Sequence, residues 1–97
     1  MFIIILTYLK DLNEVDKYLA EHKEYLNKFY QSGNFIVSGK QKPRTGGVII
    51  SKAANKQELE KIIAQDPFSM NGVAQYQIIE FEPTGCIDEL LPIFRNK

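Results

Sequence analysis

Hydrophobic and polar positions along the chain form four strand-like runs. Residues 2–9 (FIIILTYL) are β-branched and aromatic without alternation, which is typical of a strand covered on both faces. Residues 35–40 and 46–53 are two further runs, and because the short polar loop QKPRTGG connects them, we expect them to pair as a hairpin. Residues 73–82 (VAQYQIIEFE) form the fourth predicted strand.

Two other segments place apolar residues at the spacing of an amphipathic helix. The first is predicted to be one long helix, with Asn13 as its N-cap and Gly33 ending it in a left-handed conformation. Its apolar stripe consists of Val15, Tyr18, Leu19, His22, Leu26, Phe29 and Tyr30. The second predicted helix begins at Asn55, and Pro67 prevents Asp66 from continuing it.

The resulting order βαββαβ predicts an α+β protein with a ferredoxin-like fold. The four strands would form an antiparallel sheet, and right-handed crossovers would place both helices on one of its faces. A length of 97 residues suits a single domain over 1–97, with a core of about 1–83. In the tail, residues 84–97, the segment IDELLPIF predicts a short helical turn that caps the body.

The second face of this sheet would be bare and apolar. Strand 2–9 is apolar on both faces, and in strand 73–82 the side chains of Ile79 and Phe81 point away from that of Tyr76. Large bare apolar patches are rare on soluble monomers. We therefore expect a second copy of the chain to cover this face, which gives a homodimer packed sheet to sheet.

Composition excludes several classes of function. Twelve basic residues balance twelve acidic ones, and the strand GGVIIS lacks the aromatic residues of an RNA-recognition module, so nucleic-acid binding is not expected. The start MFIIILTYL has no preceding basic residues and is shorter than the roughly 20 residues of a membrane span, so a cytoplasmic protein without a membrane anchor is expected. Cys86 and His22 are the only residues of their types, so neither a metal site nor a disulfide framework is expected within one chain.

His22 lies in the middle of the apolar stripe of the first predicted helix, so its imidazole is expected to be buried. A buried imidazole without hydrogen-bond partners costs about 1–3 kcal/mol. It is either a core residue bonded to a backbone carbonyl, or a general acid or base that a carboxylate orients. Asp66 is the candidate carboxylate, because it follows the helix expected to pack beside the first. The alternative is that Asp66 is only a turn residue before Pro67.

Five further side chains are candidates for contact with a substrate. Phe68 is either a pocket wall or a core residue, and the same alternatives hold for Tyr8 at the end of the first strand. The loop residues Lys40, Lys42 and Arg44 either hold an anionic substrate or form an ordinary solvated loop. Glycines in this loop would let its backbone approach a ligand closely. Walker-type spacing is absent from the sequence, which argues against a nucleotide phosphate site.

From the first strand to about residue 82, the chain resembles the YciI-like family (YCII-related domain), small proteins of the ferredoxin-like, dimeric α/β-barrel group. The matching positions are His22, Leu26, Gly33, Ser38-Gly39, Gly46-Gly47, Asp66-Pro67-Phe68 and Gly72. The resemblance implies a homodimer with a pocket in which His22 is the acid or base and Asp66 its orienting partner. It also implies that Ser38 and Gly39 contribute to the pocket wall. The usual proline after this Ser-Gly pair is replaced by Lys40, so the loop shape and the substrate need not be shared.

Two functional hypotheses follow. In the first, the protein is a small enzyme that needs no cofactor and acts as a lyase, isomerase or hydrolase. Its substrate would be a small polar molecule, and ring-shaped compounds belong to this class. His22 would transfer the proton, Asp66 would orient it, and Arg44 or Lys42 would hold an anionic group. Related proteins include an enzyme that dehydrochlorinates a chlorinated hydroxyquinol, and neighbouring families contain isomerases and monooxygenases.

In the second hypothesis the protein is a non-catalytic dimeric module that binds a small ligand or regulates a partner, and His22 and Asp66 are structural. The fold does not decide between the two, because functions are grafted onto such scaffolds. The enzyme hypothesis requires an imidazole nitrogen about 3 Å from an Asp66 oxygen, with the other nitrogen at an open cavity.

Overall fold

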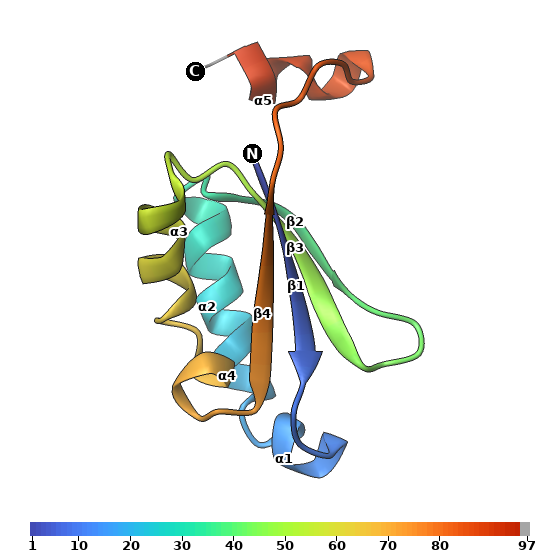
Figure 1. Ribbon diagram of the computed structural model, residues 1–97, viewed down its shortest axis with the longest axis vertical. Coiled ribbons are helices and arrows are strands. Elements are labelled where there is room, and N and C mark those ends of the chain that lie inside the picture. The colour runs from blue at the N-terminus through green and yellow to red at the C-terminus, as the bar shows by residue number, and fades with distance from the viewer. Residues whose placement is uncertain (96–97) are drawn as a thin grey trace.

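A four-stranded antiparallel sheet with the strand order β2-β3-β1-β4 forms one layer of the computed structural model, which describes residues 1–95. The strands are β1 (Phe2–Tyr8), β2 (Phe35–Lys40), β3 (Gly46–Ser51) and β4 (Ala74–Glu80). The helices that cover the sheet all lie on one of its faces (Figure 1). The predicted α+β, ferredoxin-like βαββαβ fold is therefore confirmed, and its strands lie within a few residues of the predicted ranges.

The first predicted helix is wrong in one respect, because the structure divides it into two. These are α1 (Leu12–Asp16) and α2 (Leu19–Gln31). Between them, the backbone N–H groups of Lys17 and Tyr18 bond to carbonyls only three residues back, at 3.3 and 3.0 Å. This tighter turn bends the chain, and the spacing of apolar residues does not reveal it because both helices present an apolar side to the same core.

Only the N-terminal end of this helical region differs from the prediction. Asp11, not Asn13, is the N-cap, and its side chain accepts a hydrogen bond from the backbone N–H of Glu14 at 3.0 Å. Asn13 lies inside α1 instead. Gly33 follows α2 with φ of 83°, the left-handed conformation that was predicted for it.

The second helical region contains an element that the sequence did not predict. Helix α3 (Lys56–Ile63) begins at Asn55 as expected, and the Asn55 side chain accepts from the N–H of Glu58 at 2.8 Å. After it, Pro67 does more than end a helix, because it is the first residue of a short new one, α4 (Pro67–Met70). A proline at the first helical position loses no hydrogen bond. Asp66 is the N-cap of α4.

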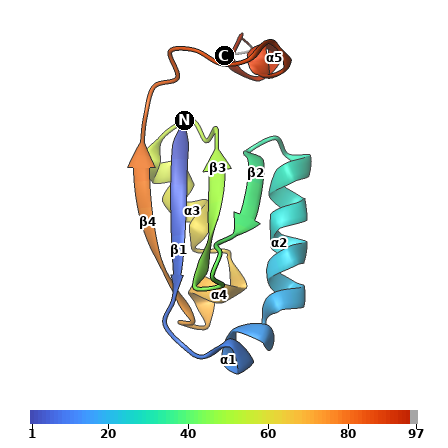
Figure 2. The ribbon, with the colours of Figure 1, turned by 90° about the vertical axis from the view of Figure 1, so that its right-hand side faces the viewer.

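The core fills the space between the sheet and the helices. Alternate side chains of β1 (Phe2, Ile4 and Leu6) are almost fully buried in it, as the period of a strand requires. Ile3 and Ile5 point to the other face, where the pairing register places Val37, Val48, Ile50 and Ile79 beside them. Figure 2 looks onto this open face, and no described element lies over it. The predicted apolar second face is therefore present.

The C-terminal tail forms the expected helical turn but does not cap the body. The segment after β4 leads to η1 (Asp88–Leu90) and α5 (Leu91–Arg95), which stand beyond the end of the sheet (Figure 1). Ile87 stays 63% exposed there. The apolar residues of the tail predict a short helix that packs against some surface. They do not tell which surface it packs against. Within residues 1–95, no helix is long and apolar enough to cross a membrane.

Candidate active site

His22 and Asp66 are in direct contact inside the core. Helix α2 carries His22, and the start of α4 carries Asp66, 44 residues further along the chain. The imidazole Nδ1 lies 2.7 Å from the carboxylate Oδ1. Only 8% of His22 and none of Asp66 is exposed to solvent. Polar side chains at this depth need hydrogen-bond partners, since an unpaired polar group would be costly to bury.

The carboxylate of Asp66 has two further donors. The backbone N–H of Phe68 donates to Oδ1 at 3.0 Å, which is the capping bond of α4, and the hydroxyl of Tyr76 on β4 donates to Oδ2 at 2.7 Å. Burial, followed by the nearby charge of Asp66, raises the pKa of Tyr76, so this hydroxyl keeps its proton and remains a donor. Contacts from three elements therefore fix the position of the carboxylate.

These contacts define how His22 presents its two nitrogens. An ionised carboxylate can only accept, so Nδ1 is the donor, and in the neutral ring Nε2 carries the lone pair. Within the described residues, the side-chain bond of His22 engages Nδ1 alone, and no buried side-chain nitrogen or oxygen lacks a partner. Nε2 therefore reaches solvent through the cavity that His22 lines. This is the arrangement required for a general base.

Phe68 fixes the plane of the imidazole. The two rings are stacked, with their centroids 4.0 Å apart and an angle of 8° between their planes. Phe68 also packs edge to face against Tyr8, with the ring centroids 6.0 Å apart. Phe68 lines the cavity and is also almost fully buried. The structure therefore places Phe68 both in the core and in the wall of the cavity, and its contact with a substrate stays a prediction.

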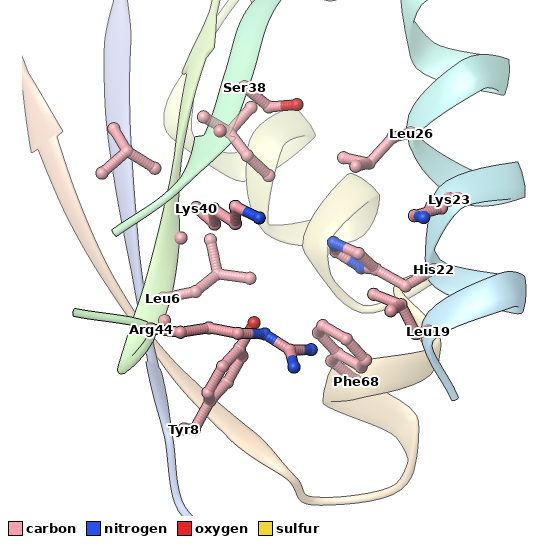
Figure 3. Close-up of a pocket in the computed structure, with 15 residues that line it drawn as sticks. Leu6, Tyr8, Leu19, His22, Lys23, Leu26, Ser38, Lys40, Arg44 and Phe68 are labelled. Carbon is pink, nitrogen blue, oxygen red and sulfur yellow. The ribbon is translucent and has the colours of Figure 1, made fainter. Parts of the chain in front are cut away.

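A cavity of about 400 Å³ lies between α2 and the inner face of the sheet (Figure 3). It is lined by Leu6, Tyr8, Leu19, His22, Lys23, Leu26, Ser38, Gly39, Lys40, Arg44, Gly46, Gly47, Val48, Ile49 and Phe68. The structure thus brings Tyr8, Ser38, Gly39, Arg44 and Phe68 together around one hollow with His22, and it places Asp66 behind the imidazole. The volume lies in the range of ordinary small-molecule pockets.

Two polar side chains of the wall, Ser38 and Arg44, already have partners within the protein. Ser38 Oγ is hydrogen-bonded to the hydroxyl of Tyr30. Arg44 donates to the carboxylate of Asp16 at 2.5 Å, and its guanidinium lies 5.9 Å from the centre of the Tyr8 ring. The hydrogen bond from Arg44 holds the pKa of the Asp16 carboxyl below its usual value. These contacts position the wall, and Arg44 enters the cavity with its charge partly neutralised.

The glycines of the hairpin serve the sheet as well as the cavity. A Cβ on Gly46 would lie 1.8 Å from the carbonyl oxygen of Leu6, and one on Gly47 would lie 3.0 Å from the carbonyl oxygen of Gly39. The close approach at Gly46 therefore serves the pairing with the neighbouring strand. Gly46 and Gly47 also line the cavity, and the approach of their backbone to a ligand stays a prediction. Gly39 has open space where its Cβ would be.

Sequence reasoning missed three side chains that complete the site. Lys23 and Leu19 lie beside His22 on α2 and line the cavity, whereas Lys42, a candidate from the sequence, does not. Tyr76 was assigned only to a face of its strand, although strand alternation places it on the same side as the helices. Within residues 1–95, no group of His, Cys, Asp and Glu side chains is arranged to hold a metal ion.

Comparisons with known proteins agree with this architecture. A family model described as "YCII-related domain" matches residues 1–82. Among solved structures, 5-chloro-2-hydroxyhydroquinone dehydrochlorinase (TftG) from Burkholderia phenoliruptrix AC1100, in complex with 2,5-dihydroxybenzoquinone, is similar with a TM-score of 0.71 and 20% sequence identity. That match covers 84% of this chain and 94% of the other, and at this identity it shows a common fold. The comparison with curated proteins found no match.

Proposed function

The chain belongs to the family with a YCII-related domain, and from this premise we propose that it is a small enzyme with His22 as its general acid or base. The observation that carries the proposal is the contact of 2.7 Å between His22 Nδ1 and Asp66 Oδ1, with Nε2 left for the cavity. Asp66 fixes the tautomer and stabilises the imidazolium that forms when the ring takes a proton. Such catalysis contributes typically about 10²–10⁴-fold to a rate.

The proposed reaction begins with a proton transfer at Nε2. The lone pair of Nε2 takes a proton from an acidic C–H or O–H of the substrate, and the electron pair of that bond stays on the substrate. In a lyase this pair expels a leaving group, and in an isomerase His22 returns the proton to another atom. In a hydrolase Nε2 instead takes the proton from the attacking water. None of these steps needs a cofactor.

The proposed substrate is a small polar molecule, with a single-ring compound as the first candidate. The cavity of about 400 Å³ has room for such a molecule, and Leu19, Leu26 and Phe68 give it an apolar side. The dehydrochlorinase of similar fold is described in complex with 2,5-dihydroxybenzoquinone, a compound of this size class. Tyr8, Ser38, Gly39 and Arg44 would contact the substrate as parts of the wall.

We further propose that residues 1–97 act as one domain and associate as a homodimer through the open sheet face. The support is the apolar patch of this face, in which Ile79 is 40% exposed and Val37 is 50% exposed. A second copy would bury this patch from water, which is the main driving force of such association. The cytoplasmic location stays a prediction.

A substrate screen on wild-type protein, His22→Ala and Asp66→Asn tests the catalytic proposal. Chlorinated and hydroxylated hydroquinones form the first panel, with proton or chloride release as the readout. We expect turnover by the wild type that falls by about a hundredfold or more in His22→Ala. Turnover that is indifferent to both substitutions rejects the dyad, and ligand binding without turnover across the panel supports the alternative of a non-catalytic binding module.

A further inference from the structure

The wall of the cavity carries an excess of positive charge. Lys23 on α2, Lys40 at the end of β2 and Arg44 in the following loop all line it. Among the described residues of the lining there is no aspartate or glutamate. Figure 3 shows the side chains of Lys40 and Arg44 extending from the sheet side toward the hollow, with His22 and Lys23 opposite. A cleft lined by one sign of charge concentrates ligands of the other sign.

Lys40 occupies a position that points inward by the geometry of the strand. In the register of the sheet it pairs with Gly47, which in turn pairs with the buried Leu6. Directly paired residues share a face, so the stem of Lys40 starts on the helix-covered face. The facing Gly47 has no side chain and leaves this space open. A lysine here extends its stem along apolar surface and brings its ammonium group to the cavity.

The two lysines differ from Arg44 in their partners. Arg44 is already bonded to Asp16. The ion pairs of residues 1–95 involve neither Lys23 nor Lys40. The positive charges of these two lysines are therefore available to a bound molecule, and Lys42, which lies outside the cavity, is not positioned to contribute.

We propose that the substrate of this site is an organic oxyanion, a carboxylate or an ionised ring hydroxyl, whose charge lies between Lys23 and Lys40. This inference rests on the proposed function and adds the substrate class to it. The apolar part of the molecule contacts Leu26 and Phe68, and the bond to be deprotonated faces Nε2 of His22. Binding through Lys40 fixes the orientation of the substrate, so Lys40 is a specificity-determining residue.

Paired probes test this inference by binding alone. Benzoate and benzamide have nearly the same shape and differ in charge, and 4-nitrophenolate and 4-nitroaniline form the second pair. Each is titrated to millimolar concentration into the full chain, and ¹⁵N chemical-shift changes of backbone amides around the cavity are measured. We expect at least one anion to bind more tightly than its neutral partner, with an affinity that falls as salt rises. The pair that responds tells whether a carboxylate or a ring oxyanion is preferred.

Substitution of the lysines makes the test specific. Lys40→Gln and Lys23→Gln should each weaken binding of the anion about three- to fivefold, the effect of one exposed ion pair, and leave the neutral partner unchanged. The matched controls are Lys42→Gln in the same loop and Lys28→Gln on the same helix, where Lys28 bonds to Gln65 instead. Both controls should bind the anion like the wild type.

Two outcomes overturn the inference. One is that neither anion binds better than its neutral partner, including the case in which none of the four probes binds. The other is that Lys40→Gln and Lys42→Gln change the affinity equally, which indicates a general charge effect. The catalytic proposal is tested separately, because His22→Gln removes proton transfer while both lysines remain. Anion binding in His22→Gln thus supports the present inference even if turnover is never found.

Discussion

The hydroxyl of Tyr76 donates a hydrogen bond of 2.7 Å to Oδ2 of Asp66. The carboxylate is fully buried, and its other oxygen faces His22. The tyrosine therefore holds the oxygen that the histidine does not use, and it sets the angle at which the carboxylate meets the imidazole. Tyr76 is in this sense a positioning residue for the candidate dyad, supplied by the last strand of the sheet.

Tyr76→Phe should lower the free energy of unfolding by about 1–3 kcal/mol, because Oδ2 of Asp66 loses its donor in a buried environment. Chemical denaturation at neutral pH measures this change. The control is Tyr18→Phe, because the hydrogen bonds of tyrosine hydroxyls within residues 1–95 are those of Tyr25, Tyr30 and Tyr76 and do not involve Tyr18. A loss no larger than that of the control would mean that the bond adds nothing to stability. If a substrate is found, the same variant should reduce kcat more than it changes KM and alter the pH profile.

The tautomer of His22 can be observed directly, because His22 is the only histidine of the chain. We expect the neutral ring to carry its proton on Nδ1, since that nitrogen faces Asp66 at 2.7 Å. Long-range ¹H–¹⁵N correlation spectra of the imidazole measure this. In Asp66→Asn the amide can donate as well as accept, so the preference for the Nδ1–H form should weaken. A wild-type spectrum dominated by the Nε2–H form contradicts the proposed base.

Alkaline pH should destabilise the fold through buried tyrosines. Burial raises the pKa of Tyr25 and of Tyr76 in the folded state, so the folded protein holds these protons after the unfolded chain has lost them. The stability that they contribute is present below the ordinary tyrosine pKa of about 10 and is lost as pH rises above it. Urea denaturation between neutral pH and pH of about 11 measures the slope. The slope should be shallower in the double variant Tyr25→Phe/Tyr76→Phe, and an unchanged slope would refute this assignment.

Two glycine-to-alanine substitutions should differ strongly in how much they destabilise the fold. In Gly46→Ala the new Cβ would lie 1.8 Å from the carbonyl oxygen of Leu6, so the β1–β3 pairing must shift, and we expect a loss of several kcal/mol, on the order of 3 or more. In Gly39→Ala the Cβ meets no atom within 4 Å, and stability should stay within about 1 kcal/mol of the wild type. Thermal denaturation of the two variants side by side decides this. Similar melting temperatures would contradict the packing derived for Gly46.

The open sheet face predicts an oligomeric state. Wild-type protein should sediment as a dimer at micromolar concentration. Ile79→Lys should sediment as a monomer, because dimer formation would bury the charge of the new lysine in the apolar patch. Leu12→Lys is the matched control, since Leu12 is 41% exposed on α1 and Ile79 is 40% exposed on the sheet. The control should remain dimeric. A monomeric wild type, or a dimer that both lysine variants retain, argues against this interface.

The sequence by itself determined the four strands, the two helical regions and their order. Runs such as FIIILTYL form strands because β-branched and aromatic side chains suit a pleated surface, and this preference is local. The same local logic predicted the N-cap at Asn55 and the left-handed Gly33, and the order of elements predicted the topology. It also brought His22 and Asp66 together as a hypothesis, since adjacent helices on one sheet face place their inner side chains near each other.

Only the tertiary structure decided what depends on residues distant in the chain. The bend at Tyr18 and the helix that Asp66 caps do not alter the apolar spacing, so the pattern could not report them. Tyr76 became a partner of Asp66, and Lys40 rather than Lys42 reached the cavity, because strand register sets which side chains meet. Side-chain spacing along one element is a local property, whereas a hydrogen bond of 2.7 Å between two elements depends on how the whole core packs.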